Sequence, residues 1–151
     1  MKISYCITAK NEDAELNRLL IFLKDNIRPE DEVIIQLDST HTLEVLDVCE
    51  NNMKLFNEYH FFVFPLNNDF ASFKNNLFKH ATGDYLFFID ADEIPNEFLV
   101  KQLPYILLSN PIIDLFWVPR INTVEGISQE DINKWRWNVN EKGWINWPND
   151  Y

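Results

Sequence analysis

The chain has 151 residues, a hydrophobic fraction of 46% and a formal net charge of −11. This length and composition suit one packed globular domain and exclude a disordered chain. The acidic balance excludes a general coat for nucleic acid, because a phosphate backbone binds basic surfaces, so we expect no nucleic-acid partner.

Several other classes of protein are disfavoured by what the sequence lacks. Cys6 and Cys49 are far apart without metal-ligand spacing, which favours a reducing compartment over a disulfide framework. We expect a cytoplasmic protein without a transmembrane segment, because there is no signal peptide and no apolar run of roughly 20 residues. Only three glycines occur, and they form neither GxGxxG nor GxxxxGK[ST].

Strand-like and helix-like segments alternate along most of the chain. The apolar run Ile3–Ala9 predicts a strand, and residues 12–27 carry leucines at helical spacing after Asn11 as an N-cap. The later predicted elements are strands at 32–37, 60–64, 85–89 and 112–118, and helices at 42–53, at 73–81 before Gly83, and from Pro95 to a bend or end at Pro104. This order predicts an α/β fold with a mostly parallel sheet and helices on both faces.

Three carboxylates, Asp90, Asp92 and Glu93, directly follow the predicted strand at 85–89. Ligands of open α/β sheets bind beyond the carboxyl ends of the strands, so these side chains should face a binding crevice. Neighbouring carboxylates repel one another, and Mg²⁺ or Mn²⁺ relieves that repulsion. Such a cation keeps positions open for a diphosphate and stabilises its departure as a Lewis acid. The alternative is that Asp92 only caps the following helix.

Four segments, taken in order, resemble family-two glycosyltransferases with the GT-A (Rossmann-like) fold. Residues 83–93 (GDYLFFIDADE) look like the family's Asp-x-Asp region, and residues 3–12 (ISYCITAKNE) are similar to its first strand. Residues 69–75 (DFASFKN) and 144–151 (WINWPNDY) resemble segments of the lipopolysaccharide-core glucosyltransferase-like branch. The resemblance implies metal-dependent transfer, with inversion, of a sugar from a nucleoside-diphosphate sugar to the hydroxyl of a glycan, lipid or protein acceptor.

The resemblance also implies roles for single residues. Asp38 would accept a hydrogen bond from the base, Asp90 would contact the ribose or the metal, and Asp92 would ligate the metal. The remaining implied contacts are Thr8, Lys10 and Glu12 near the base and ribose, Lys74 at the sugar or diphosphate, and, more weakly, Arg120 at the acceptor or a phosphate.

Several of these residues also have a purely structural interpretation. Glu12 suits the first turn of a helix, Asp38 suits a turn, and Lys74 suits a solvated helix surface. The tryptophans at 135, 137, 144 and 147 could stack on sugars, but they also suit ordinary packing.

The sequence departs from the family pattern in two places. The turn at 38–42 (DSTHT) is shorter than the family's and lacks glycine. The base that inversion requires belongs to the acceptor side, and Asp150 is the only motif-matched candidate, since Glu130 and Asp131 fit no pattern. We therefore interpret 1–151 as a single GT-A-like domain, with a nucleotide-sugar-binding part at 1–120 and the start of an acceptor-side region at 121–151.

Two other functions remain open at this point. The chain could be a truncated relative that binds nucleotide or serves in assembly without turnover, and a homo-oligomer is compatible with either function. A sugar-nucleotide nucleotidyltransferase is disfavoured, because residues 10–12 (KNE) stand where that class has a glycine- and arginine-rich loop.

Overall fold

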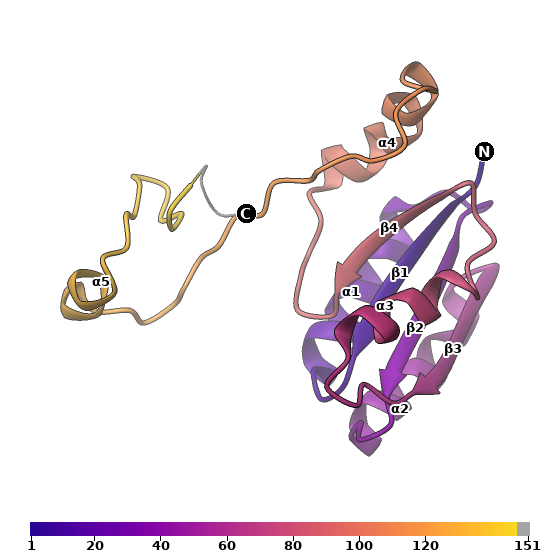
Figure 1. Ribbon diagram of the computed structural model, residues 1–151, viewed down its shortest axis with the longest axis horizontal. Coiled ribbons are helices and arrows are strands. Elements are labelled where there is room, and N and C mark those ends of the chain that lie inside the picture. The colour runs from indigo at the N-terminus through magenta and orange to yellow at the C-terminus, as the bar shows by residue number, and fades with distance from the viewer. Residues whose placement is uncertain (148–151) are drawn as a thin grey trace. The chain divides into compact units, whose positions relative to one another are not determined.

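The chain divides into two compact units, Met1–Ser109 and Asn110–Tyr151, and the computed structural model in Figure 1 describes residues 1–147. The first unit contains β1 (Ile3–Ala9), α1 (Asp13–Asn26), β2 (Glu32–Asp38), α2 (Leu43–Asn52), the 3-10 helix η1 (Met53–Leu55), β3 (Glu58–Phe64), α3 (Phe70–Phe78), β4 (Tyr85–Asp90) and α4 (Glu97–Ser109). The second unit contains α5 (Gln129–Trp135). The functional division of one domain at residue 120 stays a prediction.

The four strands form one parallel sheet in the order β3-β2-β1-β4. Helices α1 and α2 lie on one face of this sheet, and α3 lies on the other (Figure 1). Parallel strands need a crossover between them, and a helix in each crossover covers a face of the sheet. The predicted α/β fold with helices on both faces is confirmed.

The core lies on both faces, because successive side chains of a strand point to opposite sides. Tyr5 and Ile7 are buried on one side of β1, and Cys6 packs on the other with Ile34 and Leu77. Burial raises the pKa of the Cys6 thiol to about 12, so Cys6 stays uncharged and packs as a small apolar side chain.

A pair of buried amides attaches α3 to the sheet. The Gln36 Nε2 of β2 donates a hydrogen bond of 2.6 Å to the Phe73 carbonyl, and the Gln36 Oε1 accepts one of 2.9 Å from the Asn76 Nδ2. Buried amides need hydrogen-bond partners, and these two bonds form only when α3 lies at one position along β2. The helix is therefore held in register with β2, which the apolar pattern of the sequence did not indicate.

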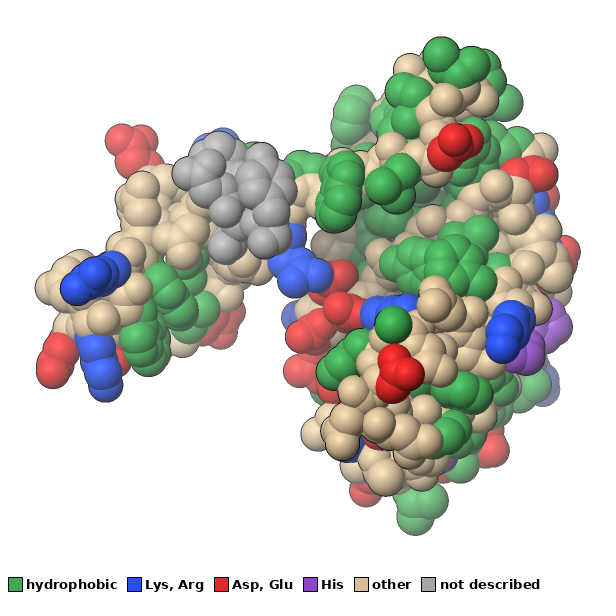
Figure 2. All heavy atoms as spheres, viewed as in Figure 1, with side chains coloured by type: hydrophobic (Ala, Val, Ile, Leu, Met, Phe, Trp, Pro, Cys, Tyr) green, Lys and Arg blue, Asp and Glu red, His purple; other side chains and the backbone are tan. Residues whose placement is uncertain are grey.

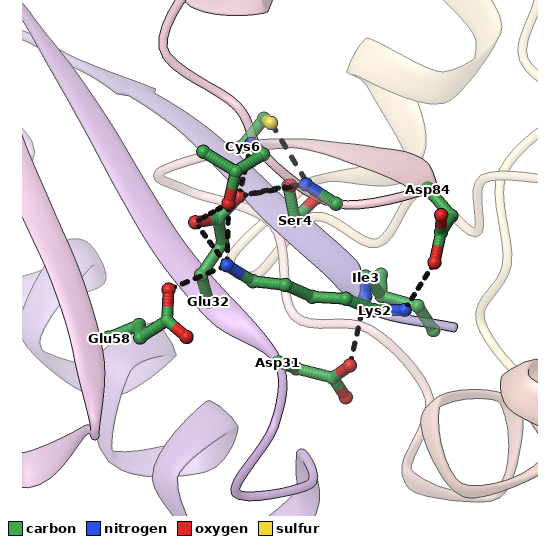
Figure 3. Close-up of polar contacts among 10 residues, drawn as sticks. Lys2, Ile3, Ser4, Cys6, Asp31, Glu32, Glu58 and Asp84 are labelled. Carbon is green, nitrogen blue, oxygen red and sulfur yellow. Dashed lines mark hydrogen bonds and ion pairs between the residues drawn. The ribbon is translucent and has the colours of Figure 1, made fainter.

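A buried carboxylate, Glu32, organises the amino-terminal ends of the strands (Figure 3). Its side chain is 0% exposed and accepts hydrogen bonds from the Lys2 Nζ (2.9 Å) and the Ser4 hydroxyl (2.5 Å). Thr82 adds bonds from its backbone N–H (2.6 Å) and its hydroxyl (2.8 Å). Burial alone would raise the pKa of Glu32, but these hydrogen bonds lower it to about 2.

Gly83 closes this network and is needed because the backbone passes very near β1. A Cβ at this position would lie 2.5 Å from the Ser4 Oγ and 2.8 Å from the Ser4 backbone nitrogen. The Gly83 N–H donates to the Ser4 Oγ and to the Glu32 Oε1, at 2.9 and 3.1 Å. The expected role of Gly83 directly past a helix was wrong, since α3 ends at Phe78 and the glycine serves a close approach instead.

Two helices, α3 and α4, differ from their predicted bounds by more than one residue. Helix α3 begins three residues early, because the Asp69 carboxylate caps it by accepting the Ser72 N–H at 2.9 Å. Helix α4 continues through the buried Pro104 to Ser109, so of the two outcomes predicted at Pro104, a bend or an end, the end was wrong. Among residues 1–147, no helix has the length and apolar character needed to cross a membrane. The cytoplasmic location stays a prediction.

The second unit has little regular structure among its described residues, 110–147. The predicted strand at 112–118 was wrong, and Ile112 and Trp117 in this segment are 91% and 84% exposed. A strand requires a neighbour that takes up its backbone groups. The ladder contacts described in this unit are two isolated bridges, in which Ile145 pairs with Asn122 and with Val139.

Candidate functional site

The carboxyl ends of β1 and β4 hold a three-residue cluster of Thr8, Lys74 and Asp90. Thr8 and Asp90 are register partners on the paired strands, and Lys74 reaches them from α3. The Thr8 hydroxyl donates to the Asp90 Oδ1 at 3.0 Å and accepts from the Lys74 Nζ at 2.9 Å. The Lys74 Nζ also contacts the Asp90 Oδ1 at 2.5 Å. The structure thus brings together three predicted site residues from three separate segments of the sequence.

Asp38 forms the second part of the site, at the carboxyl end of β2. Its carboxylate accepts the Thr40 hydroxyl at 2.7 Å and the Leu66 N–H at 3.0 Å, and the Lys10 Nζ lies 3.6 Å away. These hydrogen bonds lower the pKa of Asp38 to about 2, the one from Thr40 contributing most. Asp38 therefore does order the following turn, as its structural interpretation proposed, and it stays ionised beside Lys10.

The segment after β4 forms a tight turn that leaves Asp92 exposed. The Glu93 N–H donates to the Asp90 carbonyl at 2.9 Å, and the Glu93 Oε2 accepts the Asp90 N–H at 3.1 Å. Helix α4 begins only at Glu97, and the Asn96 Oδ1 accepts the Leu99 N–H at 3.2 Å. Capping at this helix therefore falls to Asn96, and the alternative role of Asp92 as the cap was wrong.

Glu12 directly precedes α1 and bonds to its own loop. Its Oε2 accepts the N–H groups of Lys10 and Asn11 at 2.8 and 3.1 Å, and Glu12 occupies the N-cap position predicted for Asn11. The carboxylate thereby shapes the β1–α1 loop that carries Lys10. Its predicted contact with a base or ribose stays a prediction.

A model of one protein family matches nearly the whole chain. The model described as glycosyl transferase family 2 matches residues 4–149. The chain belongs to glycosyl transferase family 2. The lipopolysaccharide-core branch within this family stays a prediction, and the comparison with curated proteins gives no match.

Solved structures share the fold of this chain. The chain is similar to S. aureus TarS 1–349, with a TM-score of 0.67 at 20% identity over 80% of this chain and 39% of that one. TarS 1–349 in complex with UDP gives 0.67 at 20% identity, over 85% and 38%. The complex with UDP-GlcNAc gives 0.64 at 21% identity, over 85% and 36%. The likeness shows a shared GT-A-like fold, and this chain spans less than two fifths of those chains.

The donor set around β4 is compatible with the divalent cation that the family resemblance implies. Asp90 is 46% exposed and Asp92 is exposed, so both offer carboxylate oxygens, which are the ligands of Mg²⁺ and Mn²⁺. Within residues 1–147, no group of three or more His, Cys, Asp or Glu side chains converges on one metal position. A cation held by two carboxylates needs further oxygens, and a diphosphate provides them.

Acidic side chains gather on the surface of the first unit near the strand ends, with a basic side chain beside them (Figure 2). This arrangement suits a ligand that brings both anionic phosphates and a cation. Lys10 and Lys74 supply positive charge within an acidic protein. The sequence had not indicated the Thr40 hydroxyl or the Leu66 N–H, because their contacts with Asp38 depend on loop geometry.

The other predicted site residues belong to the second unit. Arg120 is exposed, and Asp150 lies outside the described residues. The Trp135 and Trp137 rings lie 4.8 Å apart, and the Lys142 Nζ lies 4.7 Å from the Trp144 ring centroid. These contacts show local aromatic packing, and a sugar-stacking role for the tryptophans stays a prediction.

Proposed function

We propose that this chain binds a nucleoside-diphosphate sugar beyond the carboxyl ends of β1, β2 and β4 and transfers the sugar to an acceptor hydroxyl. The observation that carries the proposal is the cluster in which Lys74 and Thr8 meet on Asp90, two residues before the exposed Asp92. It lies where open parallel sheets bind ligands, in a chain of glycosyl transferase family 2. The acceptor is a glycan, a lipid or a protein.

Each part of the donor has a chemically suitable partner in the first unit. Asp38 is an ionised acceptor for an N–H of the base, held by Thr40. Lys10 and Lys74 offer positive charge to the ribose–diphosphate part. Asp90 and Asp92 would hold Mn²⁺ or Mg²⁺, which supplies Lewis-acid stabilisation of the diphosphate leaving group.

The transfer step exchanges one bond at the anomeric carbon. The acceptor oxygen attacks from the face opposite the diphosphate, the bond to the diphosphate oxygen breaks, and the configuration inverts. The acceptor hydroxyl must pass its proton to a base, and Asp150 is the candidate for that role. The leaving diphosphate keeps the electron pair of the broken bond.

Ligand binding tests the donor part of this proposal. We expect a panel of nucleoside diphosphates to raise the melting temperature of the chain in the presence of Mn²⁺, and to raise it less in EDTA. The Lys101→Met variant, in which an exposed lysine of α4 is removed, is the control and should respond like the wild type. If no nucleoside diphosphate shifts the melting temperature, donor binding is refuted.

Turnover tests the catalytic part. We expect the chain to hydrolyse one nucleotide sugar or to transfer the sugar from it. The Asp92→Asn variant should lower the rate of this reaction by about 100-fold or more. Binding of nucleotide without turnover by the wild type would favour the non-catalytic relative. Pyrophosphate release from a sugar phosphate and a nucleoside triphosphate would favour a nucleotidyltransferase. Product stereochemistry, read by NMR, decides between inversion and retention.

A further inference from the structure

The ammonium of Lys74 occupies a position where a divalent cation would also be attracted. It contacts the Asp90 Oδ1 at 2.5 Å, and the Thr8 hydroxyl donates to this same oxygen. The Asp90 Oδ1 thus already accepts hydrogen bonds from the Lys74 ammonium and from the Thr8 hydroxyl. A divalent cation that approaches this oxygen meets the like charge of Lys74.

Lys74 is held in this position by its helix as well as by Asp90. Residues on both sides of it anchor α3, since Gln36 bonds the Phe73 carbonyl and the Asn76 side chain. The Asp69 carboxylate fixes the start of the same helix. The backbone of Lys74 is therefore fixed, and only its flexible side chain can move away from Asp90.

A diphosphate weakens the hold of Asp90 on the Lys74 ammonium, because it brings a second set of anionic oxygens. The Lys74 side chain is 34% exposed and carries rotatable bonds, so its ammonium can turn from a carboxylate to a nearby phosphate. The Asp90 oxygen is then relieved of its ammonium partner. The same ligand that draws Lys74 away also supplies the oxygens that complete the coordination of the cation.

We infer that Lys74 makes divalent-cation binding at Asp90 depend on the nucleoside diphosphate, by holding Asp90 as an ion pair until that ligand arrives. The inference rests on the proposed function and adds an order of binding to it. Lys74 acts here as a positioning residue that works through Asp90. Cation and nucleotide then bind with positive coupling, and by thermodynamic reciprocity each strengthens the other by the same factor.

The test measures Mn²⁺ binding to the full chain by the electron paramagnetic resonance signal of free Mn²⁺, with and without saturating UDP. In Lys74→Met we expect Mn²⁺ alone to bind about two- to five-fold more tightly than to the wild type, the factor that corresponds to a partly exposed ion pair. We expect UDP to improve Mn²⁺ binding by a smaller factor in this variant than in the wild type. Lys74→Arg should restore most of the coupling.

The control variant is Lys101→Met, which changes the net charge equally through a lysine that pairs with Glu97. It should leave both Mn²⁺ affinities at their wild-type values. In an Asp90→Asn background, Lys74→Met should no longer alter the affinity for Mn²⁺ alone, because the oxygen for which the two cations compete is gone. Circular dichroism checks that each variant is folded, and Lys74→Gln replaces Lys74→Met if the latter is not.

Failure of this inference and failure of the proposed function would give different results. Equal Mn²⁺ affinity of the wild type and Lys74→Met, while UDP still binds both, would overturn the inference and leave the proposed function intact. A wild type that binds no nucleoside diphosphate with Mn²⁺ would remove the proposed function itself. An effect of Lys74→Met that Lys101→Met reproduces would also overturn the inference, because net charge would then explain it.

Discussion

The two ends of the parallel sheet carry similar groups in contrasting surroundings. At the amino-terminal end, Lys2 pairs with Glu32, which is 0% exposed and holds further bonds from Ser4 and Thr82. At the carboxyl end, Lys74 pairs with Asp90, which is 46% exposed. We infer that the burial and bonding of the carboxylate decide whether a lysine–carboxylate pair serves the fold or remains available to a ligand, because a buried anion without its partners is costly.

The strongest test of this contrast is Glu32→Gln. We expect it to lower the free energy of unfolding by about 3 kcal/mol, because an amide nitrogen would face the donors that now bond the carboxylate. Urea unfolding measures this change. Glu58→Gln is the matched control, since Glu58 bonds the same lysine but is half-exposed, and it should cost about 1 kcal/mol or less. Equal effects of the two variants would contradict the role given to burial.

Gly83→Ala tests the close approach at the same end of the sheet. We expect a loss of about 2 kcal/mol, because the added Cβ would overlap the Ser4 backbone nitrogen and displace the Ser4 hydroxyl from Glu32. The control is Gly126→Ala in the second unit, where a Cβ meets nothing within 4 Å and the cost comes from a φ of +72° alone. A Gly83→Ala protein as stable as the wild type would show that β1 can yield at this point.

The pH dependence of stability provides a third test. The pKa of Glu32 in the folded chain is about 2, below its ordinary value of 4.5, so its contribution is complete above about pH 5 and is lost as the pH falls toward 2. By pH 3.5 we expect a loss of about 1–2 kcal/mol from Glu32, with Asp38 adding in the same direction. Urea unfolding at pH 7 and pH 3.5 measures the loss. It should be smaller in Glu32→Gln, and an unchanged loss would contradict the assignment.

The smallest change in stability is expected at the carboxyl end. Asp90→Asn should alter the free energy of unfolding by about 0.5 kcal/mol or less, because the Lys74 pair is partly exposed. The same variant should weaken binding of UDP with Mn²⁺ by about ten-fold, as titration calorimetry would show. A destabilisation as large as that of Glu32→Gln would assign Asp90 to structure and end the contrast between the two ends of the sheet.

The fold could be predicted from the sequence where a local pattern determines the structure. The all-apolar strand before Asp90 and the helical spacing of leucines in α1 both gave the correct elements. The prediction of a strand at 112–118 was wrong, because the apolar residues of this segment fit a strand pattern but have no partner strand among the described residues. Helix α3 was misplaced because its start depends on the Asp69 cap, which begins the helix three residues before the predicted start at Phe73.

The candidate site was predictable as a set of residues but not as a set of contacts. Thr8, Lys74 and Asp90 were each named from short motifs, and the parallel register brings them together. The contacts of Glu32 involve residues about 30 and 50 positions away, so no local pattern indicates them. Asp38 is intermediate. Its position at the end of a strand could be predicted from the sequence, but the hydrogen bond that it accepts from the Leu66 N–H could not.

The amide pair between Gln36 and Asn76 has a consequence for the speed of events at the site. A helix packed only through apolar contacts can slide along a sheet, and such collective shifts take microseconds to milliseconds. Because α3 is fixed in register by Gln36, the motion left to Lys74 is rotation of its own side chain, which exchanges in picoseconds to nanoseconds. We therefore expect the first unit to receive its ligand without a slow rearrangement of this helix.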